Sequence, residues 1–185
     1  MTTTALLIVD LQNDYFDGGK FPLSKTEAAA ANAANLLAGF RAANRPVIHI
    51  RHEILRKPAP FFAPETKGAE IHSSVAPAAN EPVITKNFPN SFRDTDLQKQ
   101  LQALGITDLV IIGAMSNFCI DATTRAAADL GYGCTVAHDA CAAPDLAFDG
   151  VAVPAAQVHA AFMAALAMGY GAILPTKDVI AGLSN

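Results

Sequence analysis

Short runs of apolar, mostly β-branched residues alternate along this chain with longer, alanine-rich stretches of helical periodicity. The short runs predict strands at residues 5–10, 46–51, 83–86, 109–112, 134–138 and 171–174. The longer stretches predict helices at 24–43, 95–104, 117–130 and 154–168. Strands this apolar are typical of a parallel sheet that is covered on both faces. The sequence therefore predicts an α/β fold, a doubly wound, mainly parallel six-stranded sheet of Rossmann-like type with helices on both faces.

Three local features refine this outline. Ser24 and Glu27 have the spacing of a capping box at the start of the first helix, and Thr176 can cap a short terminal helix. The segment 53–82 is rich in proline and has no long periodic run. Segments of that length inside compact domains are usually functional, so we expect this one to help shape a pocket.

Length, charge and cysteine content limit the classes of protein. The 185 residues suit a single domain, 1–185, because a second core would leave each half thin. The net charge is -4 and the 13 Lys and Arg residues are scattered, which disfavours a nucleic-acid partner. No signal peptide and no apolar run of about 20 residues are recognisable, so no membrane association is expected. Three cysteines without CxxC spacing disfavour disulfides and structural zinc and fit a cytoplasmic location.

Three polar residues follow predicted strands and are the candidate catalytic groups. Asp10 ends the first strand, Lys86 ends the third, and Cys119 follows the fourth through a short connection that begins at Gly113. Ligands of open parallel sheets bind at the carboxyl ends of the strands, where these side chains could meet. A carboxylate to accept the thiol proton, a cation to stabilise charge and a sulfur to attack form a coherent set. A position near the start of a helix predicts a lowered pKa for Cys119.

Taken singly, each of these residues has a simpler interpretation. An isolated cysteine is more often a small buried hydrophobic residue, and an isolated Asp10 or Lys86 would be a turn residue or a solvated charge. The competing function is a non-catalytic, doubly wound small-molecule-binding module. No GxGxxG or GxxxxGK[ST] motif supports that alternative.

Three blocks of sequence resemble the cysteine hydrolases of the isochorismatase-like superfamily, which includes nicotinamidases and N-carbamoylsarcosine amidase. The blocks are LLIVDLQNDYF at 6–16, VITKNFPNSFRDTDL at 83–97 and VIIGAMSNFCIDATTRAAADLGY at 110–132. The resemblance implies the isochorismatase-like hydrolase fold, with Asp10 as general base, Lys86 as catalytic lysine and Cys119 as nucleophile. It also implies a cis peptide at 114–115, an oxyanion hole formed by the Met115 and Cys119 amides, and a homodimer or homotetramer.

The function implied is hydrolysis of a C–N bond in a small amide, carbamoyl or ureido compound through a thioester. Relatives that cleave a vinyl ether share the fold, and some of them lack the cysteine, so Cys119 favours acyl transfer over isochorismatase-type ether cleavage. The residues expected to contact the substrate are polar or aromatic and lie in the same blocks: Gln12, Phe16, Phe92 and Asn117.

No metal and no cofactor are expected. The nicotinamidase branch carries an Asp-x-His motif after its second strand, whereas this chain reads HIRHEILRKP, with Ile54 near the expected histidine. His49 and His52 point to opposite faces of a strand and are expected to be structural or to lie at the pocket edge. Cys134 and Cys141 are assigned no chemical role.

Overall fold

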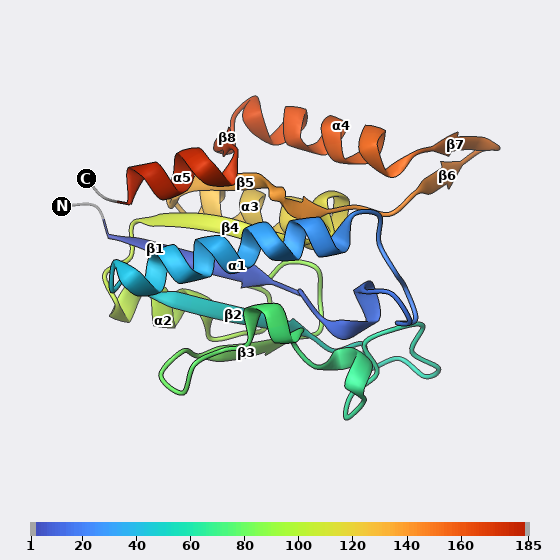
Figure 1. Cartoon of the computed structure of the whole chain (residues 1–185), viewed down its shortest axis with the longest axis horizontal. Helices are drawn as coiled ribbons and strands as arrows, with labels where there is room; N and C mark the ends of the chain where they lie inside the picture. Colours follow the sequence, from blue (N-terminus) through green and yellow to red (C-terminus); the bar gives the residue numbers. More distant parts are fainter. Residues whose placement is uncertain (1–2, 184–185) are drawn as a thin grey trace.

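A parallel sheet forms the centre of the molecule in the computed structural model, which describes residues 3–183 (Figure 1). Its six strands have the order β3-β2-β1-β4-β5-β8, and every neighbouring pair is parallel. Their bounds are β1 (Thr4–Val9), β2 (Val47–His52), β3 (Val83–Lys86), β4 (Asp108–Ala114), β5 (Gly133–Ala142) and β8 (Ala172–Leu174). The predicted six-stranded parallel sheet is confirmed.

Helices cover both faces of this sheet, as predicted. On one face, α1 (Thr26–Ala42) and α5 (Thr176–Gly182) pack over the inner strands. The other face is covered by α2 (Leu97–Ala103), α3 (Asp121–Asp129) and α4 (Ala155–Ala167). Across residues 3–183, no helix combines the length and the apolar character needed to cross a membrane.

Alternation within β1 divides the core into two layers. Leu6 and Ile8 lie against α1, whereas Leu7 and Val9 belong to the cluster beneath α2, α3 and α4. Helix α1 meets its layer with a stripe at helical spacing that comprises Ala33, Leu36, Leu37 and Phe40. Because both faces of β1 are buried, the strand needs the unbroken apolar sequence ALLIV.

The predicted helix caps are wrong. Helix α1 begins at Thr26 after a left-handed Lys25, and Ser24 instead forms an isolated antiparallel bridge with Ala143. Thr176 is the first residue of α5, and both its N–H and its hydroxyl donate to Asp139 Oδ1 at 2.7 Å. Tertiary partners therefore replace the local capping bonds that the sequence suggests.

A two-stranded hairpin between β5 and α4 was not predicted. It consists of β6 (Leu146–Phe148) and β7 (Val151–Val153) and extends beyond the body of the molecule in Figure 1. Asp149 and Gly150 both have positive φ at its turn. An Asp-Gly pair between short apolar runs is a typical hairpin signal, so this element was detectable in the sequence.

The segment 53–82 lies over the residues that follow β1. It contains two 3-10 turns, η2 (Lys67–Ala69) and η3 (Ser73–Val75), and Ile71 pairs with Gln12. Phe62 is fully buried and its ring centroid lies 4.5 Å from that of Tyr15. The segment thus helps to enclose the carboxyl edge of the sheet.

A substitution at Gly113 tests how closely the backbones of β1 and β4 approach each other beside this edge. It pairs with Val9 and has φ 126, and an added Cβ would overlap the Val9 carbonyl oxygen. We expect Gly113→Ala to lower the free energy of unfolding by about 3 kcal/mol or more, measured by urea denaturation. Gly131→Ala is the control, because Gly131 has φ 91 but nothing within 4 Å of the added Cβ. Its expected cost is about 1 kcal/mol, and equal losses would contradict the steric argument.

Candidate active site

The three candidate catalytic side chains meet at the carboxyl edge of the sheet. Asp10 follows β1, Lys86 ends β3, and Cys119 lies in a π-helical turn, η4 (Ser116–Ile120), between β4 and α3. Lys86 Nζ is 2.8 Å from Asp10 Oδ2. An oxygen of Asp10 and the Cys119 sulfur lie within 4.8 Å of one another. The structure therefore brings together three groups that are far apart in sequence.

Backbone geometry directs Asp10 into this site. Its N–H continues the sheet by donating to the Ile50 carbonyl at 3.1 Å, but its own φ is 53. The left-handed conformation is tolerated by aspartate better than by most residues, and it ends the strand here. The carboxylate is completely buried.

Lys86 is a buried ammonium held by three acceptors. Besides Asp10, it donates to the carbonyls of Phe88 and Pro89, both at 3.1 Å. Burial opposes its charge, but the negative charge of the adjacent Asp10 carboxylate outweighs that effect and raises the pKa of Lys86. Burial likewise opposes ionisation of Asp10, yet Lys86 and His52 lower the pKa of its carboxyl. The two residues therefore form an ion pair.

The expected lowering of the Cys119 pKa is wrong. The thiol is fully buried, and burial, followed by the Asp10 charge, raises the pKa of Cys119 well above its usual value despite the opposing effect of Lys86. Loss of solvation outweighs any benefit from the adjacent helix start. At neutral pH the resting sulfur is consequently a thiol.

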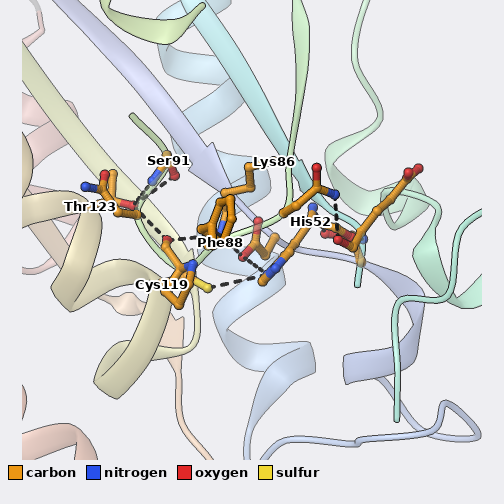
Figure 2. Close-up of polar contacts among 12 residues, drawn as sticks. His52, Lys86, Phe88, Ser91, Cys119 and Thr123 are labelled. Atoms are coloured by element: carbon orange, nitrogen blue, oxygen red, sulfur yellow. Dashed lines mark hydrogen bonds and ion pairs between the residues drawn. The ribbon is translucent and has the colours of Figure 1, made fainter. Parts of the chain in front are cut away.

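His52 lies beside Asp10 and Cys119, whereas the sequence predicts a structural role or a place at the pocket edge. Its Nδ1 lies 3.8 Å from the Cys119 sulfur and 3.6 Å from Asp10 Oδ2. Figure 2 shows the His52 ring directed at that sulfur. His52 is the last residue of β2, on the same side as Ile48 and Ile50, and it pairs with Lys86. If the register between β2 and β3 had been known from the sequence, the pairing of His52 with Lys86 would have placed His52 in the site.

Gln12, which the sequence predicts to contact substrate, hydrogen-bonds the backbone of His52. Its two amide protons are donated to the carbonyls of His52 and Ala69 at 2.8 Å, and its Oε1 accepts from the His52 N–H at 2.7 Å. The residue is fully buried. Because both donors are already used by the chain, Gln12 positions the end of β2.

The other predicted substrate residues lie in different settings. Phe16 is buried and stacks on His72 with 3.7 Å between ring centroids. Phe92 is partly buried beside Tyr132. The Oδ1 of Asn117 is buried and has no hydrogen-bond partner among the described residues. Asn117 thus offers a free acceptor, whereas Phe16 is already stacked within the protein.

The loop before Cys119 has an unusual backbone. The peptide between Ala114 and Met115 is cis, at the position that the resemblance implies. The Met115 carbonyl accepts from the N–H groups of both Phe118 and Ile120. Met115 itself is buried against the cluster that contains Tyr15 and Phe62. These contacts fix the course of the chain from β4 to Cys119.

The remaining histidine and cysteine predictions concern groups outside the site. His49 Nε2 lies 2.9 Å from Glu81, on the opposite face from His52, so the predicted divergence of the two rings is confirmed. Cys134 and Cys141 are buried thiols that donate to backbone carbonyls at 3.5 Å. Within the described residues, the grouping of side chains able to hold a metal ion is Asp10, His52 and Cys119.

A doubly wound sheet with a cysteine, a carboxylate and a lysine at its carboxyl edge has the features of the isochorismatase-like hydrolases. The isochorismatase domain model matches residues 4–177, and the chain belongs to the isochorismatase family. Among similar proteins, the isochorismatase family protein YddQ of Bacillus subtilis is 50% identical over 95% of this chain and 97% of its own length. The secreted isochorismatase effector Isc1 of Verticillium dahliae is 37% identical over 95% of this chain and 90% of its own.

Solved structures agree with this assignment. The crystal structure of an isochorismatase hydrolase from Oleispira antarctica has a TM-score of 0.95 and 57% identity. The match covers 98% of this chain and 97% of the other. Family membership and fold together identify the chain as an isochorismatase-family hydrolase.

The role of Gln12 is testable by stability. Gln12→Met keeps a similar side-chain length but leaves two carbonyls and one N–H of the buried chain without partners. We expect the free energy of unfolding to fall by about 3 kcal/mol in urea denaturation. Asn13→Ala is the control, since it removes one exposed bond to the Lys67 carbonyl and should cost at most about 1 kcal/mol. A Gln12→Met protein of unchanged stability with a raised KM would restore the substrate-binding role.

Proposed function

We propose that this hydrolase cleaves a C–N bond of a small amide, carbamoyl or ureido compound through a thioester on Cys119. The observation that carries the proposal is the buried Lys86–Asp10 ion pair at 2.8 Å beside the Cys119 sulfur. Two relatives support the reaction class. Ureidoacrylate amidohydrolase RutB of Acinetobacter baylyi is 28% identical over 75% of this chain, and streptothricin hydrolase of Streptomyces noursei is 36% identical over 77%.

Asp10 accepts the thiol proton in the first step. The pKa of Cys119 is raised and that of Asp10 is lowered, so this transfer is uphill in the resting site. Proton transfer therefore accompanies formation of the bond between sulfur and the substrate carbonyl carbon, rather than preceding it. Lys86 remains charged and offsets the negative charge that passes from Asp10 to sulfur and then to the carbonyl oxygen.

The oxyanion of the tetrahedral intermediate is assigned to the Met115 and Cys119 amides. Removing one such donor typically costs about 3 kcal/mol of transition-state stabilisation. Collapse of the intermediate breaks the C–N bond, and the proton on Asp10 leaves with ammonia or an amine. Asp10 then takes a proton from water, which attacks the thioester, and returns that proton to the departing sulfur.

Burial of the site limits which substrates can react. Asp10 and Cys119 are 0% exposed and Lys86 is 1% exposed, so a substrate reaches the sulfur only when the covering side chains move. Excluding water strengthens every charge interaction inside the site. We assign Asn117 Oδ1, which lacks a partner among the described residues, and Phe92 to substrate contact. A cytoplasmic homodimer or homotetramer acting on small molecules completes this proposal.

The reaction class is tested by measuring ammonia release from carbamoyl, ureido and simple amide compounds, with nicotinamide and pyrazinamide included. Cys119→Ala should reduce turnover by at least about a thousandfold, because no thioester can form. Lys86→Met should reduce it nearly as much, since the Asp10 carboxylate loses its buried counter-charge.

Cys134→Ala is the matched control, because Cys134 is also buried but lies outside the site. It should retain turnover, with circular dichroism used to confirm that each variant is folded. Wild-type turnover in Cys119→Ala would refute the proposal. If the protein cleaved a vinyl ether and released no ammonia or amine from any of the other compounds, isochorismatase-type chemistry would be favoured instead.

A further inference from the structure

The side chains around the nucleophile also form a set of metal ligands. Cys119 Sγ, His52 Nδ1 and a carboxylate oxygen of Asp10 all lie within 4.8 Å of one another, and all three residues are buried. Sulfur, imidazole nitrogen and carboxylate oxygen are the three donor types that zinc takes in proteins. Asp10 Oδ1 has no hydrogen-bond partner among the described residues, so a buried anionic oxygen is available.

The donor spacing is close to that of a tetrahedral zinc site. Zinc bonds of about 2.0–2.3 Å at tetrahedral angles place neighbouring donors roughly 3.3–3.6 Å apart. The observed separations are 3.8 Å from Sγ to Nδ1 and 3.6 Å from Nδ1 to Asp10 Oδ2, the carboxylate oxygen that also contacts Lys86. Rotation of the side chains can bring these donor atoms closer together by a few tenths of an ångström.

The backbone of the histidine is already fixed. Gln12 binds both the N–H and the carbonyl of His52, which orients the end of β2 toward the sulfur. Supporting contacts of this kind reduce the reorganisation that a ligand undergoes when metal binds. The cluster therefore resembles a preformed three-ligand face.

We propose that Asp10, His52 and Cys119 bind Zn²⁺ and similar thiophilic divalent cations as reversible inhibitors. On binding, the S–H bond of Cys119 breaks, its proton leaves to solvent, and a bond forms between sulfur and the metal, with water in the fourth position. No electron is transferred. The cation occupies the nucleophile and the general base together, so it blocks hydrolysis. This inhibitory ion is distinct from a resident metal, which the sequence does not predict.

Lys86 explains why such binding would be reversible. The carboxylate and the thiolate supply two negative charges, and the Lys86 ammonium beside Asp10 offsets one of them. Two further acceptors, the carbonyls of Phe88 and Pro89, keep the ammonium in place. A fixed positive charge near a divalent cation weakens its binding. Removal of Lys86 should accordingly strengthen metal binding while it abolishes catalysis.

The test uses Co²⁺ as a spectroscopic probe with the chelator-treated protein. The wild-type protein should develop a sulfur-to-cobalt charge-transfer band, and added Zn²⁺ should remove that band by displacing cobalt. Cys119→Ser should show no band, whereas Cys134→Ser, which alters a buried cysteine outside the cluster, should retain it. His52→Ala should bind cobalt at least about tenfold more weakly. Lys86→Met should bind it about tenfold more tightly or better.

The variants' fold is checked by circular dichroism before titration. A band that persists in Cys119→Ser, equal affinity in His52→Ala, or no gain in Lys86→Met would overturn the proposal, as would no band in the wild type. Zn²⁺ should inhibit the wild type and Cys134→Ser at the same concentration, with recovery on adding chelator. Because the cobalt titration does not depend on turnover, it remains decisive even if the proposed hydrolysis is refuted.

Discussion

The ion pair between Asp10 and Lys86 is the interaction on which the site depends. A carboxylate and an ammonium that are both removed from water must compensate one another, and removing either partner typically costs about 3–5 kcal/mol. Their pairing keeps both groups charged in an interior that would otherwise neutralise them. The adjacent Cys119 is a thiol, so the charge of the resting site lies on the ion pair.

The fold supplies this pair through strand order. Because β3, β2, β1 and β4 are consecutive and parallel, residues that follow different strands reach one edge. β2 lies between the strands that lead to Asp10 and Lys86, and this places its last residue, His52, among the catalytic candidates. The segment 53–82 and the aromatic cluster around Tyr15 then enclose the edge. The candidate active site is thus built from neighbours in the sheet that are distant in sequence.

Periodicity was sufficient to predict the sheet and its covering helices, and the position of Asp10, Lys86 and Cys119 after predicted strands indicated that they could meet. What sequence did not reveal depends on contacts between distant segments. Gln12 is recognised as a positioning residue only when its partners, 40 and 57 residues away, are known. The pKa of Cys119 is raised, whereas the sequence predicts that it is lowered. The position near a helix start is visible in the sequence, but the complete burial of the thiol is not.

The most direct test of the account is the intact mass of enzyme that is acid-quenched during turnover, followed by peptide mapping. The account predicts a covalent acyl adduct, equal in mass to the substrate acyl group, on the peptide that contains Cys119. The adduct should be removed by hydroxylamine, as expected of a thioester. The account would be contradicted by an adduct on a different residue. It would also be contradicted if a slowly hydrolysed substrate were turned over and no adduct could be trapped.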